Sequence, residues 1–331
     1  MDRPIDLRRL RVAAWVISAA CLGLATGCGT SHSASSTTPT VQRTTPTPPA
    51  PRPLPPAPLV VILPGVHHRG LEPWTPLAAV RGTTGVWIAR VPAHAEPGLT
   101  VTLMRFDQGL VRLVLHAGNE DPGGTGWRYG AVIGRREGRA AVVAFNSAFR
   151  ASYGAGGFMQ GRRVGWRLQR DAASVVIYAD GSADIGTWHG TVPAPGRAVA
   201  AVRQNLTLLI NHGHAASTID TCIKVCWGDP LHEQPDVARS GLGITADGEL
   251  VWAAGEGLSV RALAEALIRA GAVRAMELDI NPAWVAGYAY ARHPGSVLVP
   301  IPLVTGQIGI PGQFLAAYYR DFFSVLARPA P

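Results

Sequence analysis

Short runs of apolar residues, separated by Gly, Pro, Asn and Asp, dominate the chain between residues 85 and 212. Such runs, rich in Val, Ile and aromatic side chains and bounded by turn formers, are typical of β-strands. They predict strands at 86–90, 99–106, 110–116, 140–145, 162–169, 174–179, 183–188 and 199–210. Because helical periodicity is rare and no regular strand–helix alternation appears, the pattern predicts an α+β fold of mostly antiparallel or mixed sheets with a few packed helices.

A β-hairpin is the clearest local signal in the second half of the chain. Two apolar runs within 241–254 flank Asp247-Gly248, a pair that supplies the positive φ angles of a tight turn. Arg239 precedes the first run and is expected at the mouth of its strand.

Two segments show helical periodicity. Ser259 is a suitable N-cap for a helix over 260–270, and Gly271 is a suitable C-terminal glycine. A second helix is predicted over 313–326, where four apolar residues fall on one helical face: Phe314, Tyr318, Phe322 and Val325.

Two carboxylates lie close together after the first of these helices. The segment 275–280 reads as a strand, so Glu277 and Asp279 share one face while three apolar residues take the other. Two residues of strand separate the acids by about 7 Å. Pro282 ends the strand, which places both acids near a sheet edge.

The N-terminal 27 residues have the features of an export signal. Four arginines precede a short apolar run over residues 12–24, which fits an n-region followed by an h-region. The run ends in Leu-Ala-Thr-Gly before Cys28. This resembles a lipobox, so we expect residues 1–27 to be removed and Cys28 to carry lipid such as palmitate; ordinary secretion with an incidental cysteine is the alternative.

The next segment predicts a tether and then a globular domain. Residues 28–58 are almost entirely Ser, Thr, Pro and Ala, a composition that stays extended and forms no core. Residues 59–331 are globular in composition and long enough for one large domain. The chain is thus expected to be exported and anchored by lipid to the outer face of the cell membrane.

The remaining cysteines predict a disulfide. In an oxidising compartment Cys222 and Cys226 most simply close a small loop. A zinc site is the weaker alternative, because no histidine spacing completes a tetrahedral set. No cofactor or metal is therefore expected. Calcium near Asp279 is conceivable, but no oxygen-ligand loop of suitable spacing is present.

Charge adds little to this picture. The formal charge of +8 falls to +6 without residues 1–27, since four Arg and two Asp are removed. No basic stripe with interleaved aromatics and no nucleic-acid-binding motif is found, so no nucleic-acid partner is expected. The mild excess fits an anionic substrate or an anionic cell envelope.

Several polar residues follow apolar runs, where a site built on a sheet would take its groups. These candidates for substrate binding are Asn146, Gln204, Asn205, His212 and Asn281. Each has an alternative interpretation as a turn residue that satisfies backbone groups.

Residues 100–325 resemble the phosphodiester glycosidase domain family, which includes the lysosomal uncovering enzyme and many bacterial exported proteins. The resemblance rests on five segments: Ala144-Phe-Asn-Ser-Ala-Phe149, Gly156-Gly-Phe158 with Gly161-Arg162, Arg239-Ser-Gly-Leu-Gly243 with Thr245-Ala-Asp-Gly248, the helix 260–270, and Glu277-Leu-Asp279. Two further segments, Val202-Arg-Gln-Asn205 and Arg320-Asp-Phe-Phe323, resemble an actinobacterial exported branch.

The resemblance carries Asp279 over as a family site residue. Glu277 stands where the family has asparagine, and Ile280-Asn281-Pro282 stands where it has glycines. Triple glycine lets backbone amides approach an anion, and this freedom is absent here.

Two functions follow. One is an envelope-anchored hydrolase of sugar phosphodiester or related glycosidic bonds, with a carbohydrate or sugar-phosphate substrate. In it Asp279 is acid, base or nucleophile, Glu277 tunes the Asp279 pKa, and Arg239 pairs with phosphate. The alternative for the two acids is structural: both only pair with arginines at a sheet edge. The other function is a catalytically silent glycan-binding or envelope-scaffolding lipoprotein that retains the cleft without the glycine-rich amides. The hydrolase requires Arg239, Asp279 and Asn146 to meet at one open pocket.

Overall fold

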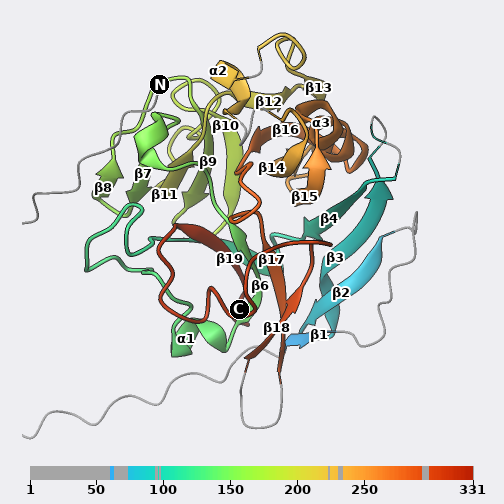
Figure 1. Ribbon diagram of the computed structural model, residues 1–331. Helices are drawn as coiled ribbons and strands as arrows, with labels where there is room; N and C mark the ends of the chain where they lie inside the picture. Colours follow the sequence, from blue (N-terminus) through green and yellow to red (C-terminus); the bar gives the residue numbers. More distant parts are fainter. Residues whose placement is uncertain are drawn as a thin grey trace, which may run out of the picture. The chain divides into compact units, whose positions relative to one another are not determined.

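Antiparallel strand pairing organises the computed structural model of the chain (Figure 1). The described residues are 60–62, 74–93, 96, 98–222, 224–229, 234–292 and 298–330. The predicted signal peptide, the tether and Cys28 lie outside them. Contacts within residues 54–331 hold that part of the chain together as one unit.

The largest sheet has nine strands, in the order β1-β2-β3-β4-β15-β14-β16-β12-β13, and is called the large sheet below. Its strands in that order are Val60–Ile62, Thr75–Val80, Thr83–Pro92, Thr100–Phe106, Leu250–Leu258, Val237–Thr245, Ala272–Glu277, Leu208–Asn211 and His214–Ala215. The strands β14 and β15 form the predicted hairpin, which is confirmed.

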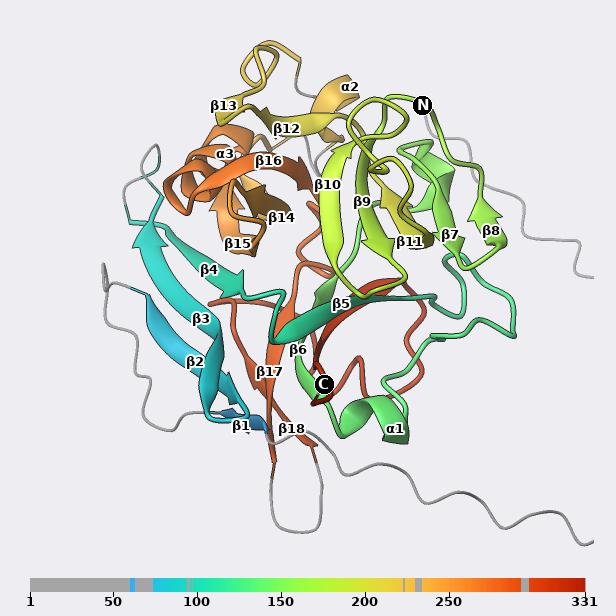
Figure 2. The ribbon, with the colours of Figure 1, turned by 180° about the vertical axis from the view of Figure 1, so that it is seen from behind.

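Two five-stranded sheets complete the fold (Figure 2). The β9 sheet has the order β10-β9-β11-β7-β8, with strands Ala183–Thr187, Ala173–Tyr178, Val199–Gln204, Phe158–Gln160 and Arg163–Trp166. The β6 sheet has the order β18-β17-β6-β19-β5, with strands Leu298–Pro302, Gly287–Arg292, Ala141–Asn146, Phe322–Ala327 and Val111–His116. Every pair of neighbouring strands in the described residues is antiparallel, so the prediction of mostly antiparallel sheets is confirmed.

Helices are few in the described part of the chain. They are α1 (Arg135–Gly138), the 3-10 turn η1 (Ala151–Tyr153), α2 (Lys224–Trp227) and α3 (Val260–Arg269). The helix α3 matches the prediction, because the Ser259 side chain accepts a hydrogen bond from the Ala262 amide and Gly271 has a φ of +95°. Its apolar face packs on β14, β15 and β16 of the large sheet. With so little helix, α+β describes the fold only coarsely.

The predicted helix over 313–326 is wrong. Residues 313–321 form turns, and the strand β19 begins at Phe322. The apolar residues of this segment do cluster, since Phe314, Tyr318 and Phe322 belong to one core. All six residues of β19 are buried: β6 and β5 pair with its two edges, one core cluster covers the face of Phe323 and Val325, and another covers the face of Phe322 and Leu326. Tertiary packing on both faces therefore overrides the local helical pattern.

Aromatic packing joins the large sheet to the β6 sheet. The ring centroid of Phe145 on β6 lies 6.1 Å from that of Phe106, 5.4 Å from Trp252 and 5.7 Å from Phe323. Gly287 lies so close to Trp252 that an added Cβ would come within 2.8 Å of the indole. The close approach of the two sheets therefore requires glycine at that position.

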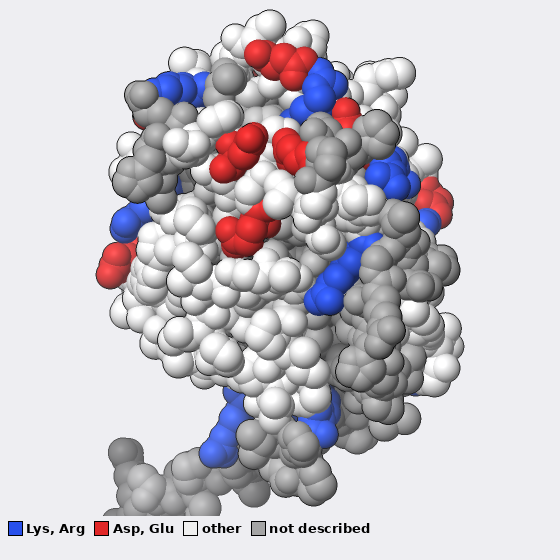
Figure 3. Space-filling model, turned by 45° about the vertical axis from the view of Figure 1, so that its right-hand side comes forward, with Lys and Arg blue, Asp and Glu red and all other residues white. Residues whose placement is uncertain are grey.

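The predicted disulfide is present, between Cys222 and Cys226. Within the described ranges, no helix has the length and apolarity needed to cross a membrane. On the face drawn in Figure 3, acidic and basic side chains are scattered over a largely uncharged surface.

Candidate functional site

Ends of strands from two sheets meet around Asp279. Asn146 ends β6, Ser240 lies near the start of β14, and Asp279 follows β16 by two residues. The Asn146 side-chain amide donates to Ser240 Oγ at 2.8 Å, and the Ser240 backbone amide donates to the Asp279 carbonyl at 2.9 Å. Asp279 is thus fixed between the large sheet and the β6 sheet.

The Asp279 carboxylate is held from two sides. Its Oδ1 accepts hydrogen bonds from the backbone amides of Ile280 at 2.8 Å and Asn281 at 3.0 Å. Its Oδ2 accepts from Arg320 Nη2 at 3.0 Å. Ile280 and Asn281 therefore use their backbone amides on this carboxylate, and so fix its orientation.

Burial raises the pKa of Asp279, although the Arg320 charge and the two backbone amides oppose this. The residue is only 3% exposed. A carboxyl group with a raised pKa can hold a proton nearer neutral pH than an exposed one, which is the property of a general acid.

A second carboxylate faces Arg320. Arg320 Nε lies 3.4 Å from Asp121 Oδ2, and Arg150 Nε lies 2.8 Å from the same oxygen. Arg320 also donates to the Ala148 carbonyl at 2.8 Å. Arg320 is thus held between two acids, Asp279 and Asp121.

Aromatic side chains stand beside Arg320. Its guanidinium carbon lies 5.1 Å from the ring centroid of Trp284, within cation–π range. Trp284 packs edge-on against Tyr319, with centroids 5.2 Å apart. Both aromatic residues are half-buried, so each presents part of a flat apolar surface to solvent.

Arg239 and Glu277 form a sealed ion pair. Arg239 Nη1 donates to Glu277 Oε1 at 2.7 Å, and the two side chains are 0% and 1% exposed. The other guanidinium nitrogens of Arg239 donate to the carbonyls of Leu258 at 2.8 Å and Pro235 at 2.9 Å. In this geometry Arg239 is out of reach of a substrate phosphate, and the predicted convergence of Arg239 with Asp279 on an open pocket is not seen.

The register of the large sheet explains this pair. Gly241 pairs with Glu277 across β14 and β16, and Arg239 shares a face with Gly241, so Arg239 and Glu277 are diagonal neighbours. Burial raises the pKa of Glu277 to about 7; the nearby Arg239 opposes this, and the Asp279 charge adds to it. The sequence predicts that Glu277 shifts the pKa of Asp279; in the structure it is the Asp279 charge that contributes to raising the pKa of Glu277.

Three predicted binding residues support the backbone. Asn146 donates to the Ser147 carbonyl as well as to Ser240. Asn205 donates to the carbonyls of Glu277 and Leu278, at 2.9 and 3.0 Å, and so fastens the segment that carries both acids.

Gln204 has a similar internal role in the β9 sheet. Its side-chain oxygen accepts from the amides of Gly157 and Gln169, and its nitrogen donates to Ser174 Oγ. Asn146, Gln204 and Asn205 are all buried. Their predicted contacts with substrate stay predictions.

The last two candidates lie in different places. His212 is exposed in the turn between β12 and β13, where the neighbouring Gly213 amide bonds to Val273 near the start of β16. The structure therefore does not bring His212 to Asp279, which follows the other end of β16. Asn281 is adjacent to Asp279, and its side-chain oxygen accepts from the Ala283 amide, which shapes the loop leading to Trp284.

The residues that sequence reasoning did not assign to the site are Asp121, Arg203, Arg320 and Asp321. Arg203 Nε bonds to Asp321 Oδ2 at 2.6 Å, and both side chains are fully buried. A signal for Arg203, Arg320 and Asp321 was present, because each is a charge next to an apolar run. Asp121, in a Gly- and Pro-rich loop, offered none.

Among the described residues, no group of three or more His, Cys, Asp or Glu side chains could hold a metal ion. The acids near Asp279 are instead engaged with arginines, which already supply positive charge at that place.

Comparisons with known proteins give distant structural similarities. No protein-family model matches the chain, and no curated protein is similar to it in sequence. The chain is similar to the auto-inhibited catalytic domain of zebrafish N-acetylglucosamine-1-phosphodiester alpha-N-acetylglucosaminidase, with 14% identity, a TM-score of 0.44, and coverage of 74% of this chain and 82% of that one.

Two bacterial structures show comparable similarity. A hypothetical protein from Synechocystis has 14% identity and a TM-score of 0.41, with coverage of 78% of this chain and 64% of that one. A protein from Burkholderia pseudomallei, described as putative exported, has 10% identity and a TM-score of 0.35, with 75% of each chain covered. These are similarities of backbone arrangement, and residue roles rest on the geometry above.

Proposed function

We propose that this protein is a hydrolase of sugar phosphodiester or related glycosidic bonds, in a revised form of the sequence-based hypothesis: Asp279 stays its acid–base group, and Arg320 replaces the sealed Arg239. The observation that supports the proposal is the setting of the Asp279 carboxylate. It lies beyond a strand end, burial raises its pKa, and Arg320 contacts it at 3.0 Å. The family resemblance of the sequence selects the same residue.

The chemistry follows from the neighbours of Asp279. A protonated Asp279 would donate its proton to the leaving oxygen as the glycosidic bond breaks; water would add its hydroxyl group to the sugar carbon, and the remaining proton of that water would re-protonate Asp279. Arg320 would pair with a phosphate oxygen through its planar donor fork, the role first predicted for Arg239. Asp121, on the other side of Arg320, is the second carboxylate that glycosidases commonly use.

Trp284 and Tyr319 define the side from which a substrate would enter. They are the half-buried aromatic residues beside Arg320. An aromatic face can cover the apolar face of a sugar ring, so we expect the sugar to lie against Trp284.

Turnover of a panel of sugar 1-phosphodiesters by the purified mature protein tests this function. Asp279→Asn should lower kcat/KM by about 100-fold or more, as expected for loss of a general acid; because it also weakens the buried pair with Arg320, activity is measured well below the unfolding midpoint of the variant. Asp184→Asn is the matched control, because Asp184 pairs with an arginine elsewhere on the surface. Equal activity of wild type and Asp279→Asn would remove Asp279 from the mechanism.

Burial of the acids favours a second candidate, a glycan-binding protein without catalysis. Asp279 is 3% exposed and the Arg239–Glu277 pair is sealed, as in a purely structural network. In that case the panel would show no turnover, while calorimetry would detect glycan binding that Trp284→Ala abolishes.

We further propose that the protein works in the cell envelope, anchored through lipid at Cys28. The lipobox-like sequence before Cys28 supports the anchor. The Cys222–Cys226 disulfide supports an oxidising compartment. Labelled palmitate should enter the protein and be lost in Cys28→Ala; an unlipidated wild type would contradict the anchor.

A further inference from the structure

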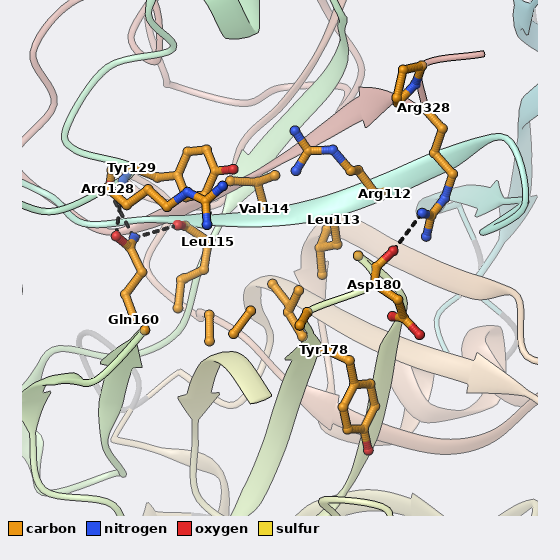
Figure 4. Close-up of a pocket in the computed structure, with 17 residues that line it drawn as sticks. Arg112, Leu113, Val114, Leu115, Arg128, Tyr129, Gln160, Tyr178, Asp180 and Arg328 are labelled. Carbon is orange, nitrogen blue, oxygen red and sulfur yellow. Dashed lines mark hydrogen bonds between the residues drawn. The ribbon is translucent and has the colours of Figure 1, made fainter. Parts of the chain in front are cut away.

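A second charged region lies between the β6 sheet and the β9 sheet, around a cavity of about 560 Å³. It runs along β5, the edge strand of the β6 sheet, and is closed by the turn after β9 and by Arg328 after β19 (Figure 4). We propose that this cavity binds a phosphate monoester that carries an apolar body.

The cavity is separate from the Asp279 site. In the β5–β19 register His116 pairs with Phe322, next to Asn146, whereas Arg112 pairs with Leu326. Four strand residues separate the two pairs, which is about 13 Å. Arg112 and Arg328 therefore lie toward the opposite ends of the same strands, and the lining extends from them along β5 as far as Leu115.

Three arginines line the cavity: Arg112, Arg128 and Arg328. In the view of Figure 4 the guanidinium of Arg112 lies between those of Arg128 and Arg328. The one acid in the lining is Asp180, and its carboxylate is engaged elsewhere, with Ser182 at 2.7 Å and Arg197 at 2.6 Å. The cavity therefore has an excess of positive charge.

Arg112 and Arg328 converge at Gly181. A Cβ added at Gly181 would lie 3.3 Å from both Arg112 Cδ and Arg328 Nη1. Gly181 has a φ of +80°, which favours glycine, so the tight turn also leaves the space in which the two side chains approach. The Arg112 stem and the Arg328 guanidinium thus meet at this turn, and the positive charge of Arg112 disfavours that of Arg328, a repulsion that a bound anion would relieve.

Internal hydrogen bonds fix Arg328 in place. Its Nε donates to the carbonyls of Gln108 at 2.7 Å and Val111 at 3.1 Å, and its Nη1 donates to the Asp180 carbonyl at 2.8 Å. These contacts are to neutral carbonyls, and no described acid lies within ion-pair distance of Arg328, although the charges of Asp180 and Asp107 act on it from farther away. Burial lowers its pKa; the Asp180 charge opposes this, and the Arg112 charge adds to it.

No described acid forms an ion pair with Arg112 or Arg128. Arg128 contacts the ring of Tyr129, with 5.4 Å from its guanidinium carbon to the centroid. Free guanidinium groups beside a preorganised one match the oxygens of a phosphate dianion, which accept several charge-assisted hydrogen bonds. A single carboxylate would neutralise less of this charge.

Apolar residues supply the rest of the lining, including Leu113, Ile177 and Ala201. A cavity of this volume is within the range of small-molecule sites, which combine apolar walls with a few polar groups. The charged groups therefore select the phosphate, and the apolar walls select the body that carries it.

Calorimetric titration of the intact mature protein with phenyl phosphate tests the proposal. Wild type should bind phenyl phosphate at least tenfold more tightly than inorganic phosphate, and binding should weaken at high salt. Arg112→Gln should weaken binding by about 10- to 100-fold, the loss of one charge-assisted hydrogen bond. Arg261→Gln is the matched control, because Arg261 is an exposed arginine that pairs with Asp220 and does not line the cavity.

Two further measurements keep the test decisive. Arg128→Gln changes an exposed side chain and should also weaken binding, so the result does not depend on the folding of one variant. No binding by wild type at 10 mM phenyl phosphate, or equal binding by wild type and Arg112→Gln, would overturn the proposal. So would binding that Asp279→Asn abolishes and Arg112→Gln leaves intact, because the ligand would then occupy the Asp279 site.

Discussion

The two charged regions of this protein differ in how their charges are compensated. Around Asp279, each of the arginines 203, 239 and 320 has an acid within 3.0 Å. Around the β5 cavity, three arginines face one acid that is turned toward other partners. Burial and pairing make the first region rigid, whereas unpaired charge makes the second receptive to an anion.

The comparison also separates two uses of arginine. Replacing one member of a buried ion pair destabilises the fold, because the other charge then stays buried without a partner to offset its desolvation. Replacing an arginine that has no acidic partner should cost the fold little stability, since its charge contributes little to the folded state in the absence of a ligand. Stability measurements on matched arginine variants can therefore locate the functional charges.

The largest effect is expected at the sealed pair. Arg239→Gln leaves Glu277 buried without its cation and should cost about 3–5 kcal/mol of unfolding free energy, measured by urea denaturation. The double variant Arg239→Met, Glu277→Met should recover most of the loss, because neither charge then remains. A double variant as unstable as the single one would show that the site does not tolerate apolar packing and would contradict this account.

An intermediate effect is expected from the pH dependence of Glu277. Its pKa is about 7 in the folded protein and near its ordinary value when unfolded, so the folded state binds more protons between these values. Stability should therefore fall as pH rises through this window, with a slope of at most about 1.4 kcal/mol per pH unit.

Glu277→Gln should remove that slope. The comparison must be between wild type and variant, because burial lowers the pKa of His116 from 6.5 to about 4 and gives an opposite slope over most of the same pH range. Unfolding free energies of both proteins from pH 4.5 to 7.5 provide the measurement; parallel profiles would exclude Glu277 as the titrating group.

Local pattern was sufficient for part of the fold. The hairpin β14–β15 depends on Asp247-Gly248, α3 depends on its Ser259 cap and apolar face, and the disulfide joins cysteines only four residues apart. The strand β19 was misread as helix because the strands β5 and β6 that pair with its two edges are far away in sequence.

In the two charged regions, too, the sequence did not predict which residues would become partners. The sequence identified Asp279 and its neighbour Glu277, but the partner of each depends on strand register and topology. Arg239 is 38 residues from Glu277, and Arg320 is 41 residues from Asp279. The cavity combines Arg112, Gly181 and Arg328, which only the packing of the β6 and β9 sheets brings together.

The smallest effect is expected where charge is unpaired. Without ligand, Arg112→Gln should change the unfolding free energy by no more than about 0.5 kcal/mol, because it breaks no ion pair with a described acid and relieves repulsion with Arg328. With phenyl phosphate in excess, wild type should gain thermal stability and the variant should gain less, since a ligand stabilises the state that binds it. A large loss of stability without ligand would mean that Arg112 supports the fold as Arg239 does, and the contrast between the two regions would fail.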